Sequence, residues 1–69
     1  MVEVFKTNVQ KATQARKLVA LLLEHYPENR INFDLHDCDK ILRIEGNNVE
    51  AHHIIMLVTE NGFACDVLE

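Results

Sequence analysis

Hydrophobic residues change their spacing twice in the first half of this chain. Residues 2–7 are rich in β-branched and aromatic types, which favours a short strand. From about residue 10 to residue 25 the apolar positions recur at the i, i+3, i+4, i+7 spacing of one helix face. Pro27 follows and should end that helix. The predicted buried stripe of the helix consists of Ala15, Leu18, Val19, Leu22 and Tyr26.

Alternation of apolar and polar residues predicts a hairpin in the middle of the chain. Residues 30–36 place Ile31, Phe33 and Leu35 on one face, as in a half-buried strand. Residues 37–39 form the predicted turn, and residues 40–45 form a second strand with Leu42 and Ile44 inward.

A second helix and a last strand complete the pattern. Asn48 is expected as the N-cap, with Glu50 in the first helical turn and Gly62 just after the helix end. Residues 63–68 should form the last strand. The predicted buried stripe of this helix is Ala51, Ile54, Ile55 and Val58, with Leu57 at its border.

The resulting order, strand-helix-strand-strand-helix-strand, predicts an α+β, ferredoxin-like sandwich. We expect one domain spanning residues 1–69, with a four-stranded antiparallel sheet. Right-handed crossovers give the strand order 4-1-3-2, with both helices on one face and the other face open. Because residue 38 then lies in the turn at one edge and residue 65 near the other, Cys38 and Cys65 should be free thiols.

Composition narrows the function classes. With 48% hydrophobic and 26% charged residues in 69, the chain is an ordinary globular protein and not a disordered tail. A net charge of −4 argues against nucleic acid or an anionic membrane as partner. The first residues lack a signal-peptide pattern and no apolar run is long enough for a membrane span, so cytoplasmic residence is expected.

Three short segments carry a resemblance: FKTNV at 5–9, DKILRIEG at 39–46 and NGF at 61–63. With the element order, they make the chain similar to the heavy-metal-associated (HMA) domains of copper chaperones and metal-transporting P-type ATPases. In that family a Cys-x-x-Cys pair, two residues after an apolar position, binds a soft metal. Aligning Val9 with the apolar position puts Lys11 and Gln14 where the cysteines stand. The resemblance therefore implies the fold without the metal, and we expect no cofactor.

Neither Lys11 nor Gln14 can replace a thiolate, because one is a cation and the other a neutral amide. We expect the first strand-helix loop, the turn at 37–39 and the loop at 61–62 to meet at one end of the sheet. There Lys11 either offsets Asp37 and Asp39 or is simply solvated.

Other side chains offer weak chemistry. Adjacent His52 and His53 diverge by about 100° on a helix, so both are interpreted as exposed residues on the solvent side. His36 and Cys38 supply at most two metal ligands. Neither cysteine has an activating cation nearby, and the chain is not expected to be an enzyme. A metal carrier that uses His36, Cys38, His52 or His53 remains the alternative.

The surface is the more informative feature. We expect Phe5 and Ile41 side by side on the open sheet face, and Met56 outside the buried stripe of the second helix. Partners are another protein or a second copy, bound through that face or an edge strand. The leading hypothesis is an interaction module, and a further alternative is a dimeric module that binds a small metabolite. The candidate surface consists of Phe5, Ile41, Met56, Lys11, Asp37 and Asp39.

Overall fold

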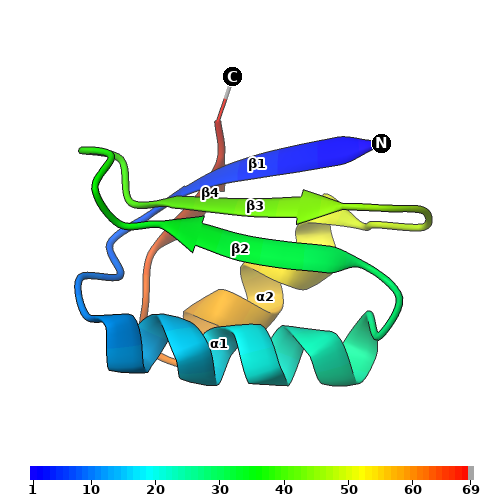
Figure 1. The fold of residues 1–69 in the computed structure, drawn as a ribbon, viewed down its shortest axis with the longest axis horizontal. Helices are drawn as coiled ribbons and strands as arrows, with labels where there is room; N and C mark the ends of the chain where they lie inside the picture. The colour runs from blue at the N-terminus through cyan, green and yellow to red at the C-terminus, as the bar shows by residue number, and fades with distance from the viewer. Residues whose placement is uncertain (69) are drawn as a thin grey trace.

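Four strands and two helices follow one another in the predicted order. The computed structural model describes residues 1–68. Its strands lie in one layer and both helices lie below it, so the other face of the sheet is open (Figure 1). This is the α+β, ferredoxin-like arrangement that the sequence predicts. The elements are β1 (Val2–Thr7), α1 (Ala12–His25), β2 (Arg30–Asp34), β3 (Ile41–Glu45), α2 (Ala51–Glu60) and β4 (Cys65–Val67).

The sheet has the order β2-β3-β1-β4, which is the predicted order counted from the opposite edge. All three pairings are antiparallel. β2 and β4 are therefore the edge strands. Helix α1 runs below β2, and α2 lies behind α1 (Figure 1).

The core fills the layer between the helices and the sheet. The stripe predicted for α1 is confirmed: Ala15, Leu18 and Leu22 are buried, and Val19 and Tyr26 pack against them. In α2 the buried residues are Ile54, Leu57 and Val58, whereas Ile55 is only half-buried. The buried stripe of α2 is thus rotated from the predicted one, toward Leu57 and away from Ile55.

The start of α2 corrects the prediction for Asn48. The N-cap is Glu50, and Asn48 lies before it with a φ of 60°. Asn is among the residues that adopt this left-handed conformation most readily, because its short side chain can bond locally. Asn48 therefore bends the chain within the β3–α2 loop, and it does not cap the helix.

Phe5 also lies elsewhere than predicted. Its side chain is fully buried, so it is a core residue and does not stand beside Ile41 on the open face. The register pairs Phe5 with Leu42, and directly opposite residues share a face of the sheet. Since Leu42 points to the helices, Phe5 must do so as well. Ile41, one residue away, points to the open face.

Candidate functional site

Three loops meet at one end of the sheet, as the sequence predicts. The Thr7 amide donates to the Asp39 carbonyl at 3.0 Å, which ties the end of β1 to the turn at residues 37–39, called the acidic turn below. The Thr7 hydroxyl donates to the Lys40 carbonyl and accepts from the Val9 amide. On the other side, the Ala64 amide donates to Asn8 Oδ1 at 2.8 Å.

Lys11 ends the β1–α1 loop and Gln14 lies in the first turn of α1; the resemblance to HMA domains aligns these two positions with cysteines. Lys11 is the N-cap of α1, with extended backbone (φ −108°) and an exposed side chain. The Gln14 side chain folds back, so that its Oε1 accepts from the Lys11 amide at 3.3 Å. This bond satisfies one of the free amides at the start of a helix. The two positions thus cap α1.

The acidic turn is held by hydrogen bonds among its own residues. Asp37 Oδ1 accepts from the Asp39 amide at 2.8 Å, and the Lys40 amide donates to the Asp37 carbonyl at 3.0 Å. Lys40 has a φ of 45°, which ends strand pairing before β3 and makes β3 start one residue later than predicted. Its Nζ donates to the Leu35 carbonyl at 3.0 Å, inside the same hairpin.

Lys11 does not pair with this turn. Within residues 1–68 the salt bridge found joins Arg43 Nε to Glu45 Oε1 at 3.5 Å. Of the two interpretations of Lys11, the structure favours the solvated residue. Ligand atoms of Asp37, Cys38 and Asp39 lie within 4.8 Å of one another, but Asp37 is already bound to backbone.

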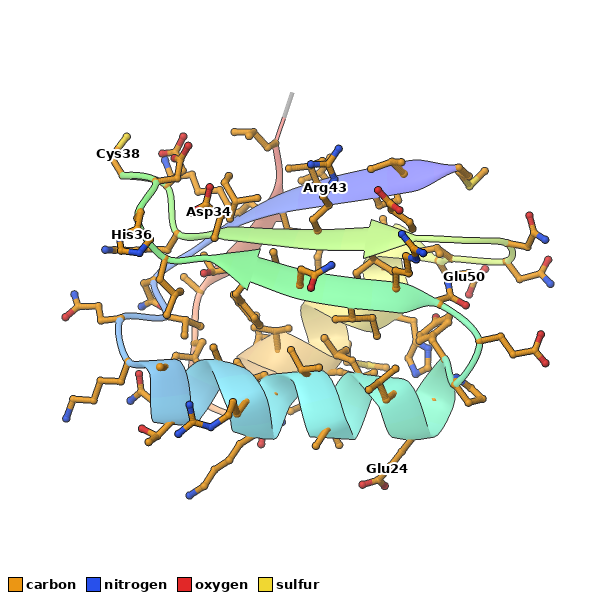
Figure 2. All side chains as sticks on the ribbon, viewed as in Figure 1. Glu24, Asp34, His36, Cys38, Arg43 and Glu50 are labelled. Carbon is orange, nitrogen blue, oxygen red and sulfur yellow. The ribbon has the colours of Figure 1, made fainter. Side chains whose placement is uncertain are left out.

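His36 and Cys38 do not converge. The Asp34 side chain accepts from the His36 amide at 3.1 Å, which ends β2 at Asp34, two residues earlier than predicted. Beyond that bend the Cys38 side chain points up from the tip of the hairpin and His36 lies below it, pointing outward (Figure 2). His36 also lies outside the cluster of metal-ligand atoms in the acidic turn.

His52 and His53 have different surroundings. His52 is exposed as predicted, but His53 is half-buried between the helices. Its Nδ1 lies 2.8 Å from the Tyr26 hydroxyl, and its ring meets the His25 ring edge-on at a centroid distance of 5.2 Å. The prediction that both histidines lie on the solvent side was wrong for His53. The contact joins residues 27 positions apart, so the helix pattern alone gave no sign of it.

The cysteines are free, as predicted. Cys38 is exposed and Cys65 is buried on β4. Burial, together with the neighbouring Asp66 carboxylate, raises the pKa of the Cys65 thiol to about 11. A thiol with that pKa stays protonated at neutral pH and is a poor nucleophile and metal ligand.

The open face of the sheet carries mixed side chains. Ile41 is half-buried there and lies opposite Asp34. Arg43 stands between Val4 on β1 and Asn32 on β2. Figure 2 shows Asp34 and Arg43 on this side, away from the helices. Charged groups therefore divide the apolar surface of this face. Met56 is 50% exposed on α2, as the sequence predicts.

Another apolar surface lies where the sequence interpretation did not place one. A groove of about 530 Å³ runs between α1 and the edge strand β2. Most of the surface that lines the groove is apolar, because α1 contributes small and aliphatic residues and β2 contributes its helix-facing side chains. We call it the α1–β2 groove; it is lined chiefly by Ala12, Arg16, Val19 and Leu23 of α1 and by Phe33 and Leu35.

The sequence did contain a signal for this groove. Leu23 is apolar and outside the predicted stripe of α1, and it is 37% exposed. Phe33 and Leu35 were predicted to face the helices, and they do so only partly covered. Phe33 on the edge strand and Leu35 just past its end are incompletely covered above α1, which leaves an opening on the unpaired side of the strand.

No family model, no curated protein sequence and no solved structure matches this chain. None of the helices within residues 1–68 is both long enough and apolar enough to cross a membrane.

Proposed function

We propose that this chain is a cytoplasmic protein-interaction module, related to HMA domains, that has lost metal binding and binds its partner at the β2 edge. The observation that carries the proposal is the α1–β2 groove beside an unpaired strand. An edge strand offers backbone hydrogen bonds, and an adjoining apolar groove accepts alternate side chains of an added strand.

The ladder between β1 and β3 determines which backbone groups are free at the β2 edge. The Gly46 amide donates to the Met1 carbonyl at 2.9 Å. Backbone groups along an antiparallel strand turn alternately to one neighbour and to the other. Counting back from Gly46 in steps of two, Ile44 and Leu42 turn their backbone groups toward β1.

Arg43, between them, therefore turns toward β2, where its partner is Asn32. Asn32 in turn uses its backbone groups for β3. Ile31 and Phe33, on either side of Asn32, direct their amides and carbonyls outward from the sheet. These are the groups that an added strand would bind, and their side chains line or border the α1–β2 groove.

The loss of metal binding is supported by the β1–α1 loop. Lys11 and Gln14 together close the start of α1 through the bond from the Lys11 amide to Gln14 Oε1. That contact brings the Gln14 side chain back to the backbone of residue 11. Cysteines at these two positions would have the Cys-x-x-Cys spacing of an HMA-type loop, so we expect them to bind one ion.

The test is a Cu(I) titration under reducing conditions of the wild-type chain and of the Lys11→Cys/Gln14→Cys variant. Thiolates select Cu(I), so the variant should bind one equivalent while the wild type should not. The matched control is Gln14→Cys/Lys17→Cys, which also places two cysteines at i, i+3 but leaves Lys11 at the N-cap. Stoichiometric binding by the wild type would refute the proposal, and Cys38→Ala or a His52/His53 double substitution would then identify the ligands.

A further inference from the structure

We infer that the partner at the β2 edge is a second copy of this chain, paired antiparallel to the first β2 about a two-fold axis at Asn32. The inference rests on the proposed function and names its partner. The result is a continuous eight-stranded sheet with four helices on one side. Its basis is the order of charges on β2, which begins with Arg30 and ends with Asp34. Two such strands paired antiparallel place opposite charges across from each other.

A two-fold axis perpendicular to the sheet keeps both helix layers on the same side, and it pairs residues of the same face. Centred on Asn32, it sets Arg30 opposite Asp34 of the second copy, and Asp34 opposite Arg30. Both side chains are exposed, and alternation along the strand puts them on the open face with Asn32. Opposite charges facing each other across two strands stabilise the pairing.

The same axis also orders the helix face of the strand. On the helix face it sets Ile31 opposite Phe33. The outward backbone groups of these two residues then exchange hydrogen bonds with their counterparts, so that four bonds form around the axis.

Neighbouring registers do not share this property. A shift of two residues in one direction sets Arg30 opposite Asn32 and leaves Asp34 without a partner on the strand. A shift in the other direction sets Asp34 opposite Asn32 and leaves Arg30 without one. Since opposite charges directly across two strands stabilise the pair, the register centred on Asn32 is favoured.

This pairing also covers the α1–β2 groove. The second copy brings its own β2 and α1 to the open side of the groove, where Val19, Leu23 and Phe33 are incompletely covered. Removing such apolar surface from water is the main favourable term in association. Backbone bonds, charge pairs and the groove therefore favour the same occupant.

The experiment is sedimentation of the wild type, Arg30→Asp and Asp34→Arg over a wide concentration range. The wild type should approach twice the monomer mass. Each single variant faces like charges twice in a self-pair, so its dissociation constant should rise about tenfold or more. Glu60→Arg, an exposed change at the far end of α2, should behave as the wild type.

An equimolar mixture of Arg30→Asp and Asp34→Arg is the decisive sample. In a mixed pair every charge again faces its opposite, so dimers should return at a concentration at which each variant alone is mostly monomeric. Circular dichroism verifies that both variants are folded. A mixture no heavier than its components, or a wild type that stays monomeric, overturns the inference.

A second measurement needs no variant. Amide exchange at Ile31 and Phe33 of the wild type should slow as the concentration rises, because only dimerisation engages those amides. Unchanged exchange at both would overturn the inference. The Cu(I) titration is independent of these results: failure of self-pairing leaves an interaction module with another partner, whereas wild-type metal binding refutes the proposed function.

Discussion

The Tyr26 hydroxyl and His53 Nδ1 lie 2.8 Å apart and join the end of α1 to α2. The Tyr26 and His53 rings also pack at a centroid distance of 5.6 Å. This is a polar contact at the helix–helix boundary, at the end of the molecule opposite to the acidic turn.

Tyr26→Phe should therefore destabilise the fold by about 0.5–1.5 kcal/mol, the usual net value of one hydrogen bond. The check is urea unfolding of Tyr26→Phe, His53→Ala and the double variant. The double variant should lose less than the sum of the two, because both changes remove the same bond. Additive losses would show that the contact contributes nothing to stability.

The Thr7 hydroxyl binds two backbone groups and is buried. Thr7→Val keeps the shape of the side chain but leaves the Lys40 carbonyl and the Val9 amide without this partner. We expect a loss of about 1–3 kcal/mol in the free energy of unfolding, because unsatisfied buried groups are costly. Thr13→Val makes the same change on the exposed surface of α1 and should cost less than about 0.5 kcal/mol. Equal effects for both variants would contradict the role assigned to Thr7.

The two thiols should react at different rates. Cys38 is exposed, whereas Cys65 is buried and has its pKa raised from 9.0 to about 11. Ellman's reagent near pH 8 should modify one thiol per native chain rapidly and two in denaturant. Cys38→Ala should abolish the rapid phase. A second rapid thiol in the native protein would contradict the burial of Cys65.

The same pKa shift predicts the pH dependence of stability. The folded chain holds the Cys65 proton more tightly than the unfolded chain does. The stabilisation is therefore complete below pH 9 and is lost as the pH rises from 9.0 to about 11. Unfolding free energies measured across this range should fall more steeply for the wild type than for Cys65→Ala. Parallel curves would contradict the shift.

Gly46 has a φ of +139°, a conformation that L side chains rarely adopt. A Cβ there would also lie 2.9 Å from the Asn29 side chain. Gly46→Ala should destabilise the chain by about 1–3 kcal/mol, measured by thermal and urea unfolding. Asn48→Gly, in the same loop at a φ of 60°, should change stability by less than about 1 kcal/mol, because glycine accepts that conformation. A harmless Gly46→Ala would show that the loop can rearrange.

Local patterns predicted the elements well, because each depends on the spacing of apolar residues along one segment. The α1 stripe from Ala15 to Leu22 and the alternation of Ile31 and Phe33 were sufficient for a helix and a strand. Element ends were less predictable. Asp34, Lys40 and Asn48 end or bend the chain through particular side-chain bonds and backbone angles, which residue spacing does not encode.

The candidate site was predictable only in part. The positions of Lys11 and Gln14 follow from the sequence, and so does the meeting of three loops at one end. The Tyr26–His53 contact and the α1–β2 groove depend on how α1 lies against its neighbours. Periodicity gives the face of a helix that is buried, but it does not give the distance to the next element.

The element order, the strand order and the separation of Cys38 from Cys65 follow from the residue pattern alone, since few topologies satisfy six such elements. The same pattern contains the charge order of β2, in which Arg30 and Asp34 flank Asn32. The place of Phe5 in the core required the three-dimensional fold, because strand register depends on the partner strand. The same holds for the apolar groove beside β2, which exists because α1 leaves the outer side of that strand uncovered.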